Sequence, residues 1–217
     1  MTLAIFDLDN TLIGGDSDNL WGQFLCEMGL VDESDFAARN EQFYLDYQAG
    51  NLDVDAYLRF ALGSLKDKPL DTLLSWHRDF MRAKIEPIIL PQALALIEQH
   101  RAHNHHLLII TATNEFVTRP IADRLNIKDM LACKAEIVNG RYTGNPIGVP
   151  SYHDGKVTRL NTWLEDQGMD MGGAYFYSDS HNDLPLLQIV DNPVAVDPDE
   201  KLRKHADMQN WPIISLR

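Results

Sequence analysis

The segment LAIFDLDNTL, residues 3–12, joins a short apolar run to two carboxylates and decides the fold. Its first four residues are apolar, as is typical of a parallel strand covered on both faces. Asp7 and Asp9 follow directly, and they point to the same side because side chains alternate along a strand. Two carboxylates this close imply a cation, a shared proton or a perturbed pKa, and the structural alternative is an acidic turn.

Other apolar runs predict the rest of the sheet. Three that end in polar or glycine-containing turns are expected to be strands: residues 107–110, 174–177 and 193–196. Stretches with helical character are expected between them: residues 91–99, 115–125, 156–167 and 184–190. This alternation predicts an α/β fold, a Rossmann-like three-layer sandwich with a parallel sheet. A small hairpin is expected around Asn139-Gly140.

Residues 16–86 break the alternation, because their apolar residues recur at helical spacing without a convincing strand. We expect a helical cap domain inserted after the first strand, on a core domain formed by residues 1–15 and 87–217. Hinges near Gly14-Gly15 and residues 87–91 would let the insert move as a lid. The aromatic residues at 43, 44 and 47 are expected to form the cap's own small core, since their spacing is helical.

Composition limits the partners. The chain of 217 residues carries 19 Lys and Arg against 32 Asp and Glu, a net charge of -13 that opposes binding to nucleic acid or an anionic membrane. An acidic protein that handles phosphate needs local positive charge from a metal, a lysine or helix N-termini. Without a leader-like or bilayer-spanning run, a cytoplasmic protein is expected.

Two further segments place phosphate-binding groups where elements meet. Thr111-Ala112-Thr113 ends the second apolar run, where hydroxyl and N–H groups can bind a phosphoryl oxygen. Lys156 begins an amphipathic helix and can neutralise phosphate as a point cation. Taken separately, a threonine at a strand end is usually a capping residue and a lysine is usually solvated.

An acidic segment follows the third apolar run. Asp179 and Asp183 lie four residues apart at a loop-helix junction, which suits a cation that prefers oxygen ligands. In chain order, the segments at Asp7, Thr111, Lys156 and Asp179 resemble the four motifs of the haloacid dehalogenase superfamily. The acidic segment is similar to that of the phosphoserine phosphatase-like branch, subfamily IB, whose insert is a C1-type cap.

The resemblance implies a mechanism and a site. It implies a phosphatase in which Asp7 forms an aspartyl-phosphate, Asp9 acts as acid and base, and Thr111 and Lys156 stabilise the phosphoryl charge. The implied Mg²⁺ ligands are carboxylates of Asp7 and Asp179, the main-chain carbonyl of Asp9 and waters oriented by Asp183. The implied substrate-binding residues are Asp16, Thr111, Ala112, Thr113, Lys156 and Asn182.

The substrate implied is a small phosphorylated metabolite. Asp16 stands where the branch has Glu, and Thr111-Ala112-Thr113 replaces its Ser-Gly-Gly, so phosphoserine and histidinol phosphate are equal hypotheses. Arg39 and Arg59 are expected to be solvated surface groups. A phosphotransferase with the same chemistry and a non-catalytic binding or sensor protein are the alternatives, and either a monomer or a homodimer is expected.

Overall fold

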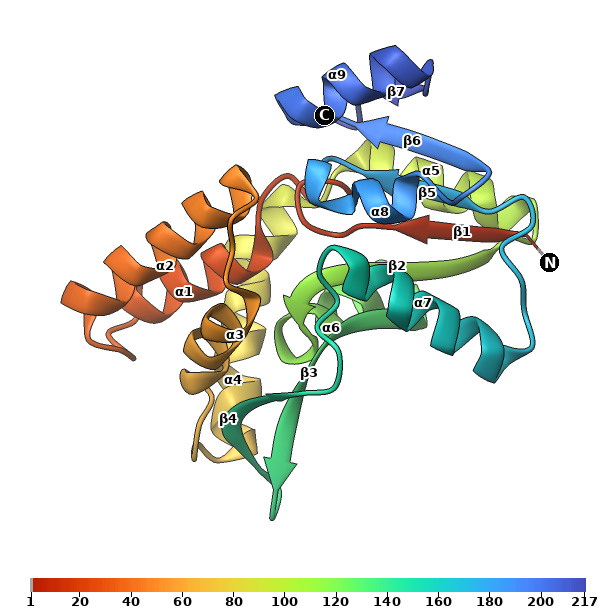
Figure 1. The fold of residues 1–217 in the computed structure, drawn as a ribbon. Coiled ribbons are helices and arrows are strands. Elements are labelled where there is room, and N and C mark those ends of the chain that lie inside the picture. Colours follow the sequence, from red (N-terminus) through yellow and green to blue (C-terminus); the bar gives the residue numbers. More distant parts are fainter. Residues whose placement is uncertain (1) are drawn as a thin grey trace.

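One sheet organises the chain in the computed structural model, which describes residues 2–217 apart from the side chains of residues 33 and 34 (Figure 1). Its order is β4-β3-β2-β1-β5-β6-β7. The strands are β1 (Leu3–Phe6), β2 (His106–Asn114), β3 (Asp129–Val138), β4 (Arg141–Ile147), β5 (Tyr175–Ser178), β6 (Asn192–Val196) and β7 (Ile213–Ile214). Within the described residues β4 pairs antiparallel with β3, and the other neighbours are parallel. The predicted parallel α/β fold is confirmed.

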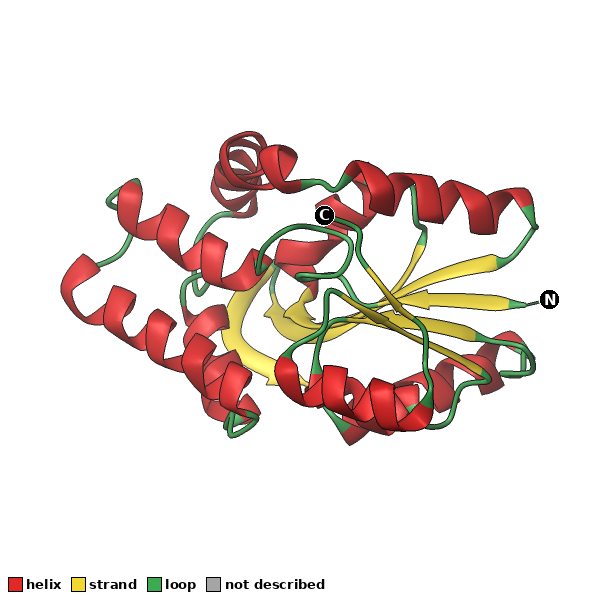
Figure 2. Cartoon of the chain, turned by 90° about the horizontal axis from the view of Figure 1, so that it is seen from above, coloured by secondary structure: helices red, strands yellow, loops and turns green. Residues whose placement is uncertain are grey.

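Helices cover both faces of this sheet (Figure 2). Those that follow β1 and its insert are α5 (Pro91–Ala102), α6 (Glu115–Arg124), α7 (Asp154–Gln167), α8 (Leu184–Leu187) and α9 (Glu200–Gln209). Ala4 and Phe6 belong to the buried cluster that includes residues of α5 and α6. Leu3 and Ile5 belong to the cluster that includes residues of α7, α8 and α9. Successive β1 residues face opposite layers, which explains why all four are apolar.

A helical segment lies between β1 and α5, as predicted. It contains α1 (Ser17–Glu27), α2 (Glu33–Ala49), α3 (Val54–Gly63), α4 (Leu70–Phe80) and the short helical turns η1 (Met81–Ile85) and η2 (Glu86–Ile88). Its two connections to the core run side by side: Ile13 forms an antiparallel bridge with Ile89, and the Gly14 amide donates to the Ile88 carbonyl over 2.7 Å. The two predicted hinge segments are therefore paired.

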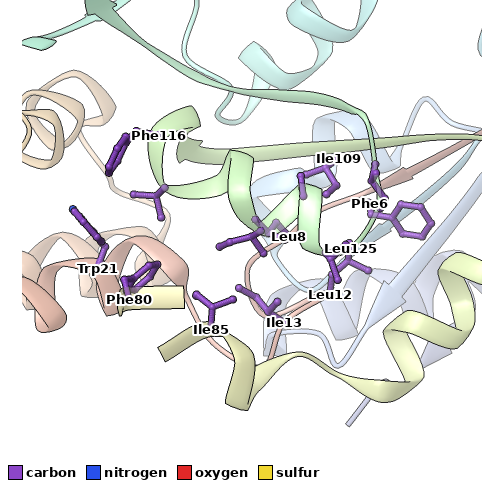
Figure 3. Close-up of a cluster of buried hydrophobic side chains, with 14 of the residues drawn as sticks. Phe6, Leu8, Leu12, Ile13, Trp21, Phe80, Ile85, Ile109, Phe116 and Leu125 are labelled. Atoms are coloured by element: carbon purple, nitrogen blue, oxygen red, sulfur yellow. The ribbon is translucent and has the colours of Figure 1, made fainter. Parts of the chain in front are cut away.

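The inner helices of the insert are packed into the main hydrophobic core. Trp21 of α1 meets Phe80 edge-on at 5.1 Å between ring centroids and meets Phe116 of α6 at 5.5 Å. The same buried cluster continues through Leu8 and Ile13 to the sheet (Figure 3). Because these side chains belong to one buried cluster, α1 and α4 are anchored to the core by apolar contact.

Several boundaries differ from those predicted. β2 continues to Asn114, with a register shift between Ile110 and Asn114. The helix expected at residues 184–190 is shorter, because α8 ends at Leu187; a 3₁₀ turn, η3 (His181–Asp183), precedes it. The Asn139-Gly140 turn is confirmed, but its strands extend the main sheet. No helix in the described part of the chain has both the length and the apolarity to cross a membrane.

We expect His100 to weaken the protein in acid. It is 5% exposed, with Nε2 2.8 Å from the Tyr177 hydroxyl. Burial, and then the neighbouring His105 and His103, lower its pKa from 6.5 to about 4. As the pH falls from about 6.5 towards 4, the unfolded chain binds a proton that the folded protein excludes, so stability is lost by at most roughly 3 kcal/mol.

Urea unfolding at several pH values checks this expectation. The free energy of unfolding of His100→Gln should fall less steeply between pH 7 and pH 5 than that of the unmodified protein. His205→Gln, on α9 at the other face of the sheet, is the control and should keep the original slope. Identical slopes for all three proteins would contradict the assignment.

Candidate active site

Asp7 and Asp9 begin the site, at the carboxyl end of β1. The Asp7 amide donates to the Tyr177 carbonyl over 2.9 Å, which extends the β1–β5 pairing by one residue. Asp7 is 3% exposed, whereas Asp9 is half-buried. Leu8 between them is buried in the core. Strand alternation therefore places both carboxylates on the side away from Leu8, as predicted from the sequence.

A buried ammonium faces Asp7. Lys156, in the first turn of α7, is 1% exposed, and its Nζ donates over 2.8 Å to Asp7 Oδ1 and to Asp183 Oδ2. Burial raises the pKa of Asp7 to about 7, against the opposing charge of Lys156. Burial also disfavours the charged lysine, but Asp183 and Asp7 outweigh it and hold the pKa of Lys156 above its ordinary value. Lys156 is therefore an ammonium that links two segments of the site.

The end of β2 and the start of α1 hold Asp9. Thr113 Oγ1 donates to Asp9 Oδ2 over 2.9 Å, and Thr111 Oγ1 lies 3.3 Å from the same oxygen. The Ser17 amide, at the first residue of α1, donates to Asp9 Oδ1 over 2.6 Å. The Ser17 contact was not predicted, because it is made by a backbone amide, and every residue except proline has one. The type of residue at position 17 therefore does not indicate the contact. Both oxygens of this carboxylate are thus held by neighbouring elements.

The acidic loop after β5 completes the inner site. Thr11 Oγ1 donates to Asp179 Oδ1 over 3.1 Å and accepts from the Asp179 amide over 3.1 Å. Ser178 Oγ donates to Asp183 Oδ2 over 2.7 Å. Burial, followed by the charges of Asp7 and Asp183, raises the pKa of Asp179 well above its usual range. The loop therefore brings two more carboxylates next to Asp7.

The charges of this inner site do not balance. The carboxylates of Asp7, Asp179 and Asp183 are all buried or nearly so, and Lys156 is the ammonium that the described residues place among them. A further cation would lower the pKa values that burial raises. The donor set is all oxygen, which fits a hard divalent cation.

The geometry favours a cation that keeps water ligands. In the described part of the chain, no three Asp, Glu, His or Cys side chains form a ready-made metal cage. Asp183 already accepts from Lys156 and Ser178. Asp7 and Asp179 are the carboxylates left to bind directly, and one or two carboxylates plus substrate oxygens and water is the usual coordination of Mg²⁺.

A pocket opens above Asp7 and Asp9, between the core and the helical insert. The residues that line it are Asp7, Asp9, Asp16, Asn19, Asn40, Phe43, Tyr44, Tyr47, Leu52, Val54, Tyr57, Thr111, Ala112 and Thr113. Of the predicted substrate-binding residues, Asp16, Thr111, Ala112 and Thr113 are among them. Phe43 packs against Phe60 of the cap, as expected, but Phe43, Tyr44 and Tyr47 also line the pocket.

Asn182, predicted to bind substrate, lies beside the pocket. Its Nδ2 donates to the Tyr47 carbonyl over 2.9 Å, and its Oδ1 accepts from the Tyr152 hydroxyl over 3.3 Å. Lys201 Nζ donates to the Ala49 carbonyl over 2.9 Å. These contacts join the end of α2 to the core, and they position the cap wall that carries Tyr47.

Comparisons with known proteins agree with this geometry. Residues 4–188 match the family of haloacid dehalogenase-like hydrolases. A histidinol-phosphatase of Neisseria meningitidis is 47% identical over 219 residues, 99% of each chain. A crystal structure of a protein of unknown function from Bordetella pertussis, 39% identical, covers 100% of both chains with a TM-score of 0.94. A substrate-bound phosphoserine phosphatase covers 100% of this chain and 93% of its own with a TM-score of 0.73, at 15% identity, which shows the fold alone.

The sheet brings four polar segments together at one edge, and the chain belongs to the haloacid dehalogenase-like hydrolase family. Within that family it is a phosphatase. The resemblance seen in the motifs is confirmed.

We predict that Lys156→Met lowers the free energy of unfolding by about 3–5 kcal/mol, because it leaves the buried Asp7 and Asp183 without a counter-charge. Urea unfolding in EDTA measures this loss. Lys84→Met is the control: it breaks the exposed pair of Lys84 with Glu27, and should cost less than about 1 kcal/mol. An equal loss in the free energy of unfolding for the two variants would contradict the prediction that the buried ammonium is more stabilising than the exposed one.

Proposed function

We propose that the protein is a Mg²⁺-dependent phosphomonoesterase that acts on a small phosphorylated metabolite through an aspartyl-phosphate on Asp7. The observation that carries this proposal is the position of Asp7: its carboxylate is at the floor of the pocket and within 2.8 Å of the Lys156 ammonium. Phosphoryl transfer depends mainly on positioning and on stabilising charge, and this arrangement provides both.

In the first step an Asp7 oxygen attacks phosphorus, and the bond from phosphorus to the ester oxygen breaks. Asp9 donates its proton to the leaving oxygen. In the second step Asp9 takes a proton from water as the water oxygen attacks phosphorus, and the bond to Asp7 breaks to release phosphate. The bonds of Asp9 to Ser17, Thr111 and Thr113 fix the direction of its carboxylate.

The other inner residues bind charge. Lys156 and the Thr111 hydroxyl would stabilise the equatorial phosphoryl oxygens together with the amides that follow Thr111. Carboxylates of Asp7 and Asp179 and the main-chain carbonyl of Asp9 would hold Mg²⁺, with Asp183 orienting its waters. When bound, this cation would neutralise charge between nucleophile and phosphate.

The helical segment serves as the cap in this proposal. Residues 16–86 form the cap domain, and residues 1–15 and 87–217 form the core domain. The paired connections at Ile13 and Ile89 support this division, because both chain crossings occur at one place. The cap supplies much of the pocket lining, so it would enclose the non-phosphate part of the substrate. Histidinol phosphate and phosphoserine are the two substrates proposed.

We predict that Asp7→Asn abolishes turnover while leaving the fold intact, because the amide is a poor nucleophile. The measurement is phosphate release from histidinol phosphate, phosphoserine and p-nitrophenyl phosphate with Mg²⁺, with circular dichroism to check folding. Asp71→Asn, in the exposed first turn of α4, is the matched control and should retain full activity.

Two outcomes would contradict the mechanism. Turnover by a cleanly purified Asp7→Asn protein at the parental rate would exclude Asp7 as the nucleophile. Undiminished activity of the parent protein after exhaustive treatment with EDTA would exclude the Mg²⁺ requirement. Acid quenching of the parent protein with ³²P-labelled substrate should trap a phosphoprotein that the Asp7→Asn variant lacks.

A further inference from the structure

The wall of the pocket is acidic and aromatic. Among the described lining residues the charged side chains are those of Asp7, Asp9 and Asp16, and no Arg, Lys or His is present. Four aromatic side chains, those of Phe43, Tyr44, Tyr47 and Tyr57, line the same space. A substrate group that reaches past the phosphate site therefore meets negative charge and ring faces.

A buried carboxyl group, that of Asp18, lies behind the wall, and burial raises its pKa to about 7. Asp18 is 4% exposed; it accepts from the Tyr57 hydroxyl through Oδ2 and from Asn114 Nδ2 over 3.3 Å through Oδ1. In the described part of the chain it forms no ion pair. Asp18 thus fixes the Tyr57 ring, which lines the pocket, and keeps a carboxylate close to Asp16.

Asp16 and Asn19 present polar atoms at the same wall. Asp16 caps α1 by accepting from the Asn19 amide over 2.8 Å. Burial, and then the charge of Asp9, raise the pKa of Asp16 well above its usual range, as expected for a carboxylate without a counter-ion. The Nδ2 of Asn19 is buried without a hydrogen-bond partner, although its residue lines the pocket. Asp16, which lines the pocket, is available to a ligand.

The arginines of the cap do not serve this pocket. Arg39 lies 3.6 Å from Asp35, and its guanidinium lies 4.7 Å from the centre of the Phe60 ring. Arg39 and Arg59 line a separate groove on the cap. Both are exposed, so the expectation that they are surface groups is confirmed. A substrate carboxylate in the active-site pocket would have no arginine to bind it.

We infer that the pocket selects phosphomonoesters whose other end is cationic, preferably next to an aromatic ring, and carries no carboxylate, with Asp16 and Tyr57 as specificity-determining residues. This inference rests on the proposed function and deepens it. An ammonium gains a charge-assisted hydrogen bond to Asp16 and attraction to the ring faces. A carboxylate there is buried without a cation, which is strongly unfavourable. Of the two proposed substrates, histidinol phosphate meets these conditions and phosphoserine does not.

Three phosphomonoesters test the selectivity. Phosphoethanolamine and phosphoserine differ only by the carboxylate, and histidinol phosphate adds an imidazole ring to the amine. We expect kcat/KM to rise at least about 10-fold from phosphoserine to phosphoethanolamine, and again to histidinol phosphate, as a charged hydrogen bond and a desolvated ring contact would give. A value for phosphoserine equal to or above that for phosphoethanolamine would overturn the inference.

Variants test the residues. Asp16→Asn keeps a good helix cap and removes the charge, so kcat/KM for histidinol phosphate should fall by about 10- to 100-fold relative to that for p-nitrophenyl phosphate, which has no cationic group. Asp53→Asn makes the same change at the exposed cap of α3, outside the pocket, and should leave this ratio unchanged. Tyr57→Phe keeps the ring, loses the bond to Asp18 and should lower the ratio by a smaller factor. If Asp16→Asn leaves the ratio of the two kcat/KM values unchanged, Asp16 acts only as a helix cap and does not determine specificity.

Binding separates this inference from the proposed function. Calorimetry on the Asp7→Asn protein with Mg²⁺ should give tighter binding of histidinol phosphate than of phosphoserine, without any need for turnover. If the parent protein hydrolyses none of the esters yet the binding order holds, the proposed function fails and the selectivity stands. If the parent hydrolyses esters but binds phosphoserine as tightly or more tightly, the selectivity alone is rejected.

Discussion

The buried ion pairs of Lys156 are the interaction on which the site depends. One ammonium, 2.8 Å from Asp7 Oδ1 and from Asp183 Oδ2, joins the end of β1, the start of α7 and the loop after β5. The first turn of α7 requires a glycine next to Lys156, since a Cβ on Gly155 would collide with the carbonyl of Pro150. Because two buried carboxylates share this one cation, its removal would leave both uncompensated.

Much of the fold and of the candidate site could be predicted because each of the motifs is attached to a local pattern. Asp7, Thr111 and Asp179 each lie at or just after the end of an apolar strand, and the order β2-β1-β5 makes these strands neighbours. Parallel neighbours end at one edge of a sheet, so side chains far apart in sequence are brought together by topology alone. Lys156 was found from its place at the start of a helix, in the order of the motifs.

The wall of the pocket could not be predicted in the same way. Helical spacing shows that Phe43, Tyr44 and Tyr47 lie near one another on α2, but it does not say what that face meets. Asn182 illustrates the same limit, since its amide is taken up by Tyr47 and Tyr152 from other parts of the chain. β7 was missed because a two-residue strand carries no measurable alternation. Tertiary contacts decide all three features, and they leave no periodic signal.

The charge balance explains how so acidic a protein can accept a phosphate. The net charge is -13, and the ammonium of Lys156 is already shared by Asp7 and Asp183. A phosphate dianion placed beside these carboxylates would worsen the imbalance, so the second cation proposed at Asp7 and Asp179 would favour its binding. At the wall of the pocket, Asp16 and Asp18 are carboxylates without a cationic partner among the described residues. A substrate with its own positive charge would supply that partner. On this argument the metal would offset part of the negative charge at the phosphate end, and a cationic substrate group would offset part of it at the wall.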